Sequence, residues 1–81
     1  MDNTNIFNVN EIKNEEVKEV LKDVYDALIE RHYNPVNQLT GYLMSGDLAY
    51  ISSHKDARKK IGSISREKIL EVLLNSFMEK S

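Results

Sequence analysis

The apolar residues of this chain recur every three or four positions, which is the period of an amphipathic helix rather than of a strand. Asn14 is a suitable N-cap, and the acidic residues at 15–16 suit the positive end of a helix dipole. We expect this first helix to end near Arg31–His32, because Pro35 disfavours a helical conformation at the residue before it. Its apolar stripe consists of Val17, Val20, Leu21, Val24 and Leu28, widened by Tyr25 and Ile29.

A second helix is predicted to follow at once. Asn34 is a natural N-cap, and Pro35 suits the first helical position, where its missing N–H costs nothing. Gly46 matches a left-handed stop after the last turn. Gly41 lies in mid-helix at a cost of about 1 kcal/mol relative to alanine, which suggests close approach by another helix or a ligand. The predicted inner face consists of Val36, Leu39, Tyr42 and Leu43.

Two further helices are predicted after an unusually apolar connection at 47–51, which we expect to fold down onto the body or a partner. Ser53 and Asp56 have the spacing of a capping box, which opens a short basic helix ending at Gly62. The last helix begins near Ser65, and Ile64 and Ile69 are spaced as a hydrophobic staple. Its apolar residues cover more than one narrow stripe: Ile69, Leu70, Val72, Leu73, Leu74, Phe77 and Met78.

These patterns predict an all-α fold, a compact bundle of about four short helices at 14–81 preceded by a flexible tail at 1–13. A chain of 81 residues has a small core, and without cysteine no disulfide can reinforce it. A terminal helix that is apolar on two sides must bury both of them. We therefore expect a homodimer, because one short chain can hardly cover that much apolar surface.

Composition and charge narrow the kind of partner and the compartment. The net charge is −2, with −5 on residues 1–30 and +3 on residues 31–81, which two solvated helix faces explain most simply. No basic start leads into an apolar run at residues 1–10, and no stretch approaches the roughly 18 apolar residues of a membrane span. We expect a cytoplasmic protein without membrane insertion.

The candidate chemistry is sparse. No cysteine is present and His32 and His54 are 22 residues apart, so we expect no metal site, and no glycine-rich motif predicts a cofactor. The only group of nucleophile, base and acid stands at a predicted helix start, where capping accounts for it: Ser52, Ser53, His54 and Asp56. We therefore expect no enzyme.

A run of basic residues leaves a second function class open. These residues precede a turn and another helix, which loosely imitates a helix-turn-helix: Lys55, Arg58, Lys59 and Lys60. A nucleic-acid-binding helical module is therefore the alternative function, although the negative net charge makes nucleic acid an unfavoured partner. A structural subunit of a larger assembly is a third possibility.

The stretch 33–51, which reads YNPVNQLTGYLMSGDLAYI, closely resembles the signature of the IreB family of small bacterial proteins. A looser likeness extends over residues 17–78. The resemblance implies a cytoplasmic, homodimeric regulatory protein without catalysis. It also implies phosphorylation by a membrane Ser/Thr kinase with PASTA domains, opposed by a phosphatase, in cell-envelope stress and cephalosporin resistance. Family members are modified on N-terminal threonine, and Thr4 is the residue here that matches that position.

A cleft at the dimer interface is our hypothesis for the motif. It would receive a small anionic ligand or a peptide of a downstream protein. The residues that would line it are polar or aromatic and come from the motif and the next helix: Tyr33, Asn34, Asn37, Gln38, Tyr42, Asp47, Tyr50 and Arg58. The alternative is that these residues fasten loops and dimer by hydrogen bonds. Phosphate on Thr4 would release the tail from the acidic first helix or dock it on the basic third one.

Overall fold

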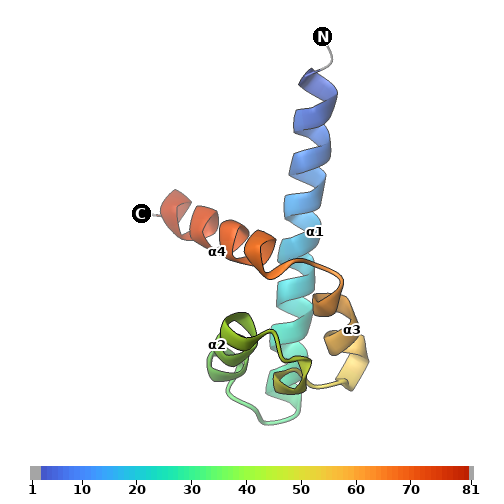
Figure 1. The fold of residues 1–81 in the computed structure, drawn as a ribbon, viewed down its shortest axis with the longest axis vertical. Helices are drawn as coiled ribbons and strands as arrows, with labels where there is room; N and C mark the ends of the chain where they lie inside the picture. The colour runs from blue at the N-terminus through green and yellow to red at the C-terminus, as the bar shows by residue number, and fades with distance from the viewer. Residues whose placement is uncertain (1–2, 81) are drawn as a thin grey trace.

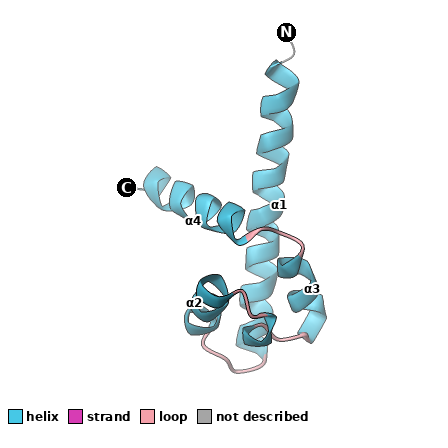
Figure 2. Ribbon diagram, viewed as in Figure 1, coloured by secondary structure: helices cyan, strands magenta, loops and turns pink. Residues whose placement is uncertain are grey.

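A computed structural model of the chain describes residues 3–80, with side chains for residues 14–80. This part of the chain is all-helical and contains no strand (Figures 1 and 2). Its elements, in order, are α1 (Asn3–Glu30), α2 (Pro35–Ser45), the 3-10 turns η1 (Leu48–Tyr50) and η2 (His54–Asp56), α3 (Ala57–Gly62) and α4 (Arg66–Lys80).

The first helix is longer than predicted, with 28 residues. It begins at Asn3, so Asn14 lies inside the helix and the prediction that it is an N-cap was wrong. The physical reason is that residues 3–13 contain neither proline nor glycine, so nothing stops the helix from extending past a weak local capping signal. The predicted mobility of residues 1–13 stays a prediction.

The C-terminal end of α1 is closed by a residue in the left-handed conformation. His32 has a φ of 67°, and its N–H donates to the carbonyl of Ile29 at 2.9 Å. The N–H of Tyr33 donates to the carbonyl of Leu28 at 3.0 Å. This pair of bonds is the Schellman arrangement, which satisfies carbonyls that the helix itself leaves open. The predicted end near Arg31–His32 is confirmed.

The bounds of α2 follow the predicted signals. The Asn34 side chain accepts a hydrogen bond from the N–H of Asn37 at 3.1 Å, and Pro35 occupies the first helical position. Gly46 ends the helix with a φ of 78°. Val36 is wrongly predicted to face inward, because at the start of the helix it is 66% exposed.

The segment before α3 departs from its predicted capping box. Ser53 makes no capping hydrogen bond with its side chain, and Asp56 has a φ of 61°. Ser52 makes the side-chain bond to the backbone instead, because its hydroxyl accepts a hydrogen bond from the N–H of His54 at 3.0 Å. Lys55 and Asp56 are consecutive left-handed residues, which separate η2 from α3 by a kink. The prediction failed because the capping box requires extended backbone before a continuous helix.

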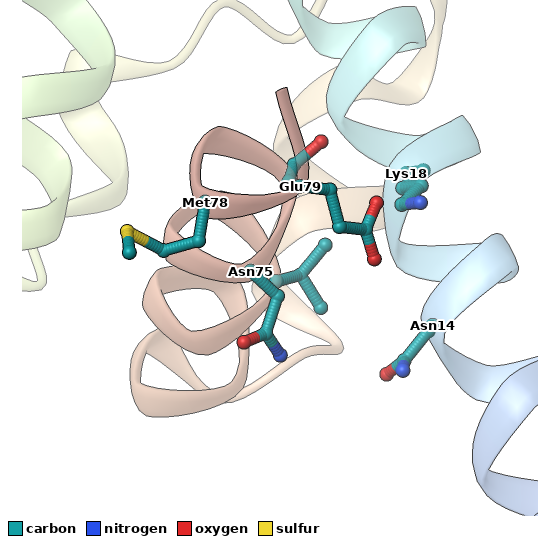
Figure 3. A pocket seen from close by; sticks show the side chains of 7 residues that line it. Asn14, Lys18, Asn75, Met78 and Glu79 are labelled. Carbon is teal, nitrogen blue, oxygen red and sulfur yellow. The ribbon is translucent and has the colours of Figure 1, made fainter. Parts of the chain in front are cut away.

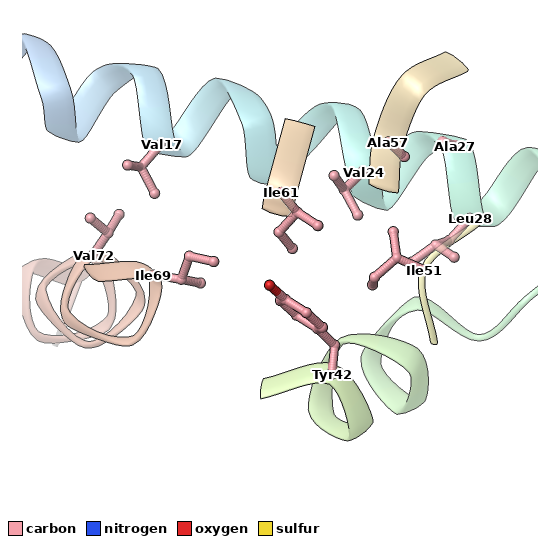
Figure 4. Packing of buried hydrophobic residues seen from close by; sticks show 10 residues of the cluster. All are labelled: Val17, Val24, Ala27, Leu28, Tyr42, Ile51, Ala57, Ile61, Ile69 and Val72. Atoms are coloured by element: carbon pink, nitrogen blue, oxygen red, sulfur yellow. The ribbon is translucent and has the colours of Figure 1, made fainter. Parts of the chain in front are cut away.

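The buried core joins all four helices (Figure 4). α1 forms its spine, and α3 packs against the half of α1 that carries Val24 and Ala27, while Val72 of α4 faces Val17. The apolar connection folds down onto the body as predicted, since Ile51 is fully buried. The complete set is Val17, Val24, Ala27, Leu28, Tyr42, Ile51, Ala57, Ile61, Ile69 and Val72.

The last helix begins as predicted and leaves most of its apolar surface open. Ser65 caps α4 by accepting from the N–H of Lys68 at 3.1 Å. From there α4 crosses α1 and projects away from it instead of lying alongside as in a regular bundle (Figure 1). Five apolar side chains of α4 are between 42% and 66% exposed: Leu70, Leu73, Leu74, Phe77 and Met78. Among residues 3–80, no helix combines the length and apolar character that crossing a bilayer requires.

Candidate functional site

Within the motif 33–51, the 3-10 turn η1 folds back against α2, the helix that precedes it. Gln38 reaches across from the first half of α2, and its Nε2 donates to the carbonyl of Tyr50 at 2.9 Å. The ring of Tyr50 lies over Gly41, where a Cβ atom would come within 2.6 Å of Cδ1 of the tyrosine. The glycine in mid-helix therefore allows a close approach, but the approaching group is a side chain of the motif itself and not another helix or a ligand, as was predicted.

Two further contacts close the C-terminal end of α2. Asp47 accepts a hydrogen bond from the N–H of Ala49 at 2.9 Å, which caps η1. Arg66, at the start of α4, donates from Nη1 to the carbonyl of Leu43 at 3.1 Å. A guanidinium placed at the negative end of a helix dipole is favourable. These two bonds hold the backbone in the region where α2 ends and η1 begins.

Arg58 ties the end of the motif to α3. Its Nε donates to the carbonyl of Ile51 at 2.9 Å, and its backbone N–H donates to the carbonyl of Ser52 at 3.1 Å. Because Ile51 is fully buried, this side chain satisfies a carbonyl at the edge of the core. Arg58 therefore has a structural task, and its other guanidinium N–H groups make no hydrogen bond among residues 14–80.

The residues predicted to line one cleft do not meet in one depression of a single chain. Tyr33 borders a small depression of about 300 Å³ together with Arg31 and His54. Arg58 borders a different one of about 560 Å³ beside α3. Tyr42 is buried in the core. Four of the eight hold the backbone of the motif or its exit by side-chain hydrogen bonds: Asn34, Gln38, Asp47 and Arg58.

This arrangement agrees with the alternative that the polar residues fasten loops. Asn37 contributes its backbone N–H, and the side chains of Asn37 and Tyr33 are exposed. Whether a second copy completes a cleft around them stays a prediction. The side chain of Thr4 lies outside the described residues, although its backbone belongs to α1.

The acidic and basic parts of the chain are partly paired within one molecule. Glu30 accepts from His54 Nε2 at 2.7 Å and lies 3.1 Å from Lys55 Nζ. The hydrogen bond with His54, and after it the bond with Lys55, lowers the pKa of the Glu30 carboxyl below its ordinary value. Lys60 pairs with Asp23 of α1 at 3.2 Å. Two cations of the basic run are therefore already engaged, which reduces the charge left for nucleic acid.

A third depression lies between α1 and α4 (Figure 3). It has a volume of about 310 Å³, and it is lined by Asn14 and Lys18 of α1 and by Asn75, Met78 and Glu79 of α4. The Glu79 side chain points toward Lys18, whereas the Met78 side chain points away from α1. The Oδ1 atom of Asn14 is buried and has no hydrogen-bond partner among residues 14–80. The lining of the depression is mixed, because Val72 and Met78 of α4 are apolar and the other lining residues are polar or charged.

Sequence reasoning missed two residues that hold this region together, Glu30 and Arg66, each of which bridges distant elements. Ser52, which the sequence analysis attributed to capping, does fix a turn. The positive charge of Arg66 so close to a predicted helix start gave no local reason to place it at the end of α2. Only Ser52 offered a signal, as a hydroxyl two residues before His54 in a turn.

Comparison with known proteins covers nearly the whole chain. The model of the family described as IreB regulatory phosphoprotein matches residues 2–79. A UPF0297 protein from Acetivibrio thermocellus is 46% identical over 77 residues, which are 95% of this chain and 86% of that protein. The description is of a regulatory phosphoprotein and names no enzymatic activity. The chain therefore belongs to the IreB family of small regulatory phosphoproteins.

Proposed function

We propose that this protein is a cytoplasmic, non-enzymatic regulator that acts as a homodimer and is switched by phosphorylation of Thr4. The family match at residues 2–79 carries the proposal, because it includes the N-terminal segment as well as the helical body. The kinase would be a membrane Ser/Thr kinase with PASTA domains, opposed by a phosphatase. The process would be the response to cell-envelope stress, including cephalosporin resistance.

The exposed apolar face of α4 supports the homodimer. Leu74 and Met78 are 62% and 66% exposed in the single chain, and Leu70 and Leu73 are more than 40% exposed. A contiguous apolar surface of this kind is typical of interaction sites. The two-fold axis of a dimer would let the same face of each copy cover the other.

Phosphorylation of Thr4 would act through charge. Phosphate adds about −1.5 to −2 charge at neutral pH. Residues 1–30 already carry a net −5, so the modification increases repulsion within that part of the chain and attraction to the basic part.

The proposal is tested by sedimentation of the purified protein and by intact-mass spectrometry of the protein isolated from its cells. We expect a dimer, and a fraction of chains heavier by one phosphate that disappears in Thr4→Ala. Thr40→Ala, in the middle of α2, is the matched control and should keep the phosphate. A monomer at all concentrations, or phosphate that persists in Thr4→Ala, would contradict the proposal.

A further inference from the structure

The depression beside α3 combines apolar residues with two cations that form no ion pair among residues 14–80. It has a volume of about 560 Å³, and Leu48 and Gly62 form part of its lining. The remaining lining residues are polar or charged: Ser53, Asp56, Arg58, Lys59 and Ser63. Two cations and one carboxylate give this lining a net charge of +1.

The two cations differ from their neighbours in the basic run. Lys55 and Lys60 are held by Glu30 and Asp23, whereas Lys59 has no hydrogen bond or ion pair within residues 14–80. Arg58 is fixed by its Nε bond to the carbonyl of Ile51, so its position is set before any ligand arrives. An arginine held in place loses less side-chain entropy when it binds an anion.

We propose that this depression binds the N-terminal segment of a second copy when Thr4 of that segment is phosphorylated. The phosphate is held by Arg58 and Lys59, since arginine offers a planar pair of donors to phosphate and lysine adds a point charge. Ile6 and Phe7 follow Thr4 in the sequence and supply apolar side chains for the floor at Leu48. The inference rests on the proposed phosphorylation of Thr4.

The second copy follows from the geometry of α1. Thr4 lies in the first turns of α1, and α3 packs beside Val24 in its other half (Figures 1 and 4). Twenty residues of helix separate positions 4 and 24 by about 30 Å. A segment of the same chain would have to unwind from α1 to reach the depression, whereas a neighbouring copy can present it directly.

The test uses a synthetic peptide of residues 1–13 with phosphothreonine at position 4, added to isotope-labelled full-length protein and followed by NMR. We expect saturable shifts at the backbone amides of Ser53, Lys59, Gly62 and Ser63. The same peptide without phosphate should bind at least tenfold more weakly, since charge-assisted bonds carry the contact. Inorganic phosphate alone should cause weaker shifts at the same residues.

Three single substitutions make the test specific. Lys59→Gln should weaken peptide binding roughly two- to fivefold, the effect of one ion pair at the surface. Lys60→Gln removes the same charge from the next residue outside the depression and should leave the affinity nearly unchanged. Asp56→Asn should tighten binding, and asparagine tolerates the φ of 61° at this position.

Equal binding of both peptides, equal effects of Lys59→Gln and Lys60→Gln, or no shifts around α3 would overturn the inference. Because the peptide carries its phosphate by synthesis, the result does not depend on modification in cells. Binding of the peptide with no phosphate on Thr4 in cellular protein would leave the surface established and refute the proposed function. Phosphate on Thr4 in cellular protein, together with no binding of the phosphopeptide, would support the proposed function and refute this binding surface.

Discussion

Tyr50 packs its ring directly over Gly41, and this contact leaves no room for a side chain at the glycine. A Cβ atom there would lie 2.6 Å from Cδ1 and 2.8 Å from Cζ of the ring. We predict that Gly41→Ala lowers the free energy of unfolding by about 1–3 kcal/mol, because overpacking outweighs the gain in helix propensity. Urea unfolding measures this change.

The matched control for this substitution is Gly62→Ala. A Cβ atom at Gly62 would meet Leu48 at 3.4 Å, an ordinary contact distance, so the stability should stay within about 1 kcal/mol of the original. Combining Gly41→Ala with Tyr50→Ala should cost less than the sum of the two single changes. Strict additivity would show that the ring is not what restricts position 41.

His32 supplies a second prediction about stability. Its φ of 67° is unfavourable for any residue with a Cβ atom, so His32→Gly should stabilise the protein by about 1 kcal/mol. His32→Ala keeps that penalty and should bring no gain. Thermal unfolding of the two variants decides the matter, and equal melting temperatures would disprove the role of the left-handed conformation.

The ion cluster at Glu30 predicts a dependence of stability on pH. The bonds with His54 and Lys55 lower the pKa of Glu30 in the folded chain, so its contribution is present above the ordinary value of 4.5. That contribution is lost as the pH falls through this value towards the lower folded-state pKa. We expect Glu30→Gln to flatten the acid limb of a stability curve measured by urea unfolding between pH 3 and 7.

Glu19 provides the comparison for this experiment, since it makes no ion pair within residues 14–80. Glu19→Gln should therefore leave the acid limb in place. If both substitutions flattened it equally, general charge reduction would explain the effect and the cluster would not.

Because Arg58 donates to the carbonyl of Ile51, we predict that replacing Arg58 lowers stability more than replacing its neighbour Lys59. Arg58→Ala should lower the free energy of unfolding by about 1–3 kcal/mol, because a carbonyl at the edge of the core loses its donor. Lys59→Ala removes a charge without a described bond and should change stability by less than about 0.5 kcal/mol. Similar losses for both would contradict the structural task of Arg58.

The exposed face of α4 predicts a change in self-association. Leu74→Asp should weaken the proposed dimer at least tenfold, since burial of a leucine contributes about 1.5–3 kcal/mol per copy. The fold of the single chain should persist, because Leu74 is 62% exposed there. Thr40→Asp adds the same charge at an exposed position of α2 and should leave sedimentation unchanged.

Signals that act over a few residues predicted the bounds of α2 correctly, but they misplaced the starts of α1 and α3. Asn34, Pro35 and Gly46 set the bounds of α2 because each restricts or satisfies the backbone next to it. Asn14 misled because a capping residue only favours a helix start and does not impose one when the preceding residues tolerate helix. Ser53 misled because the left-handed residues at 55–56 change the direction of the chain.

Contacts between residues far apart in the chain could not be predicted from the sequence. The bond from Arg66 to Leu43 spans 23 residues, and the bond from His54 to Glu30 spans 24. Neither follows from spacing, because both depend on how the helices cross. Within one chain, two members of the predicted cleft, Gln38 and Arg58, donate to nearby backbone carbonyls. Whether a second copy completes the cleft stays a prediction.

The closed turn formed by α2 and η1 has a consequence for the order of folding. Its defining contacts join residues no more than twelve positions apart, as between Gln38 and Tyr50. Closing so short a stretch costs little chain entropy, and short sequence separation speeds the search for native contacts. We therefore expect this segment to gain protection from hydrogen exchange early in refolding, before α4 docks on α1, and to act as a template for the later helices.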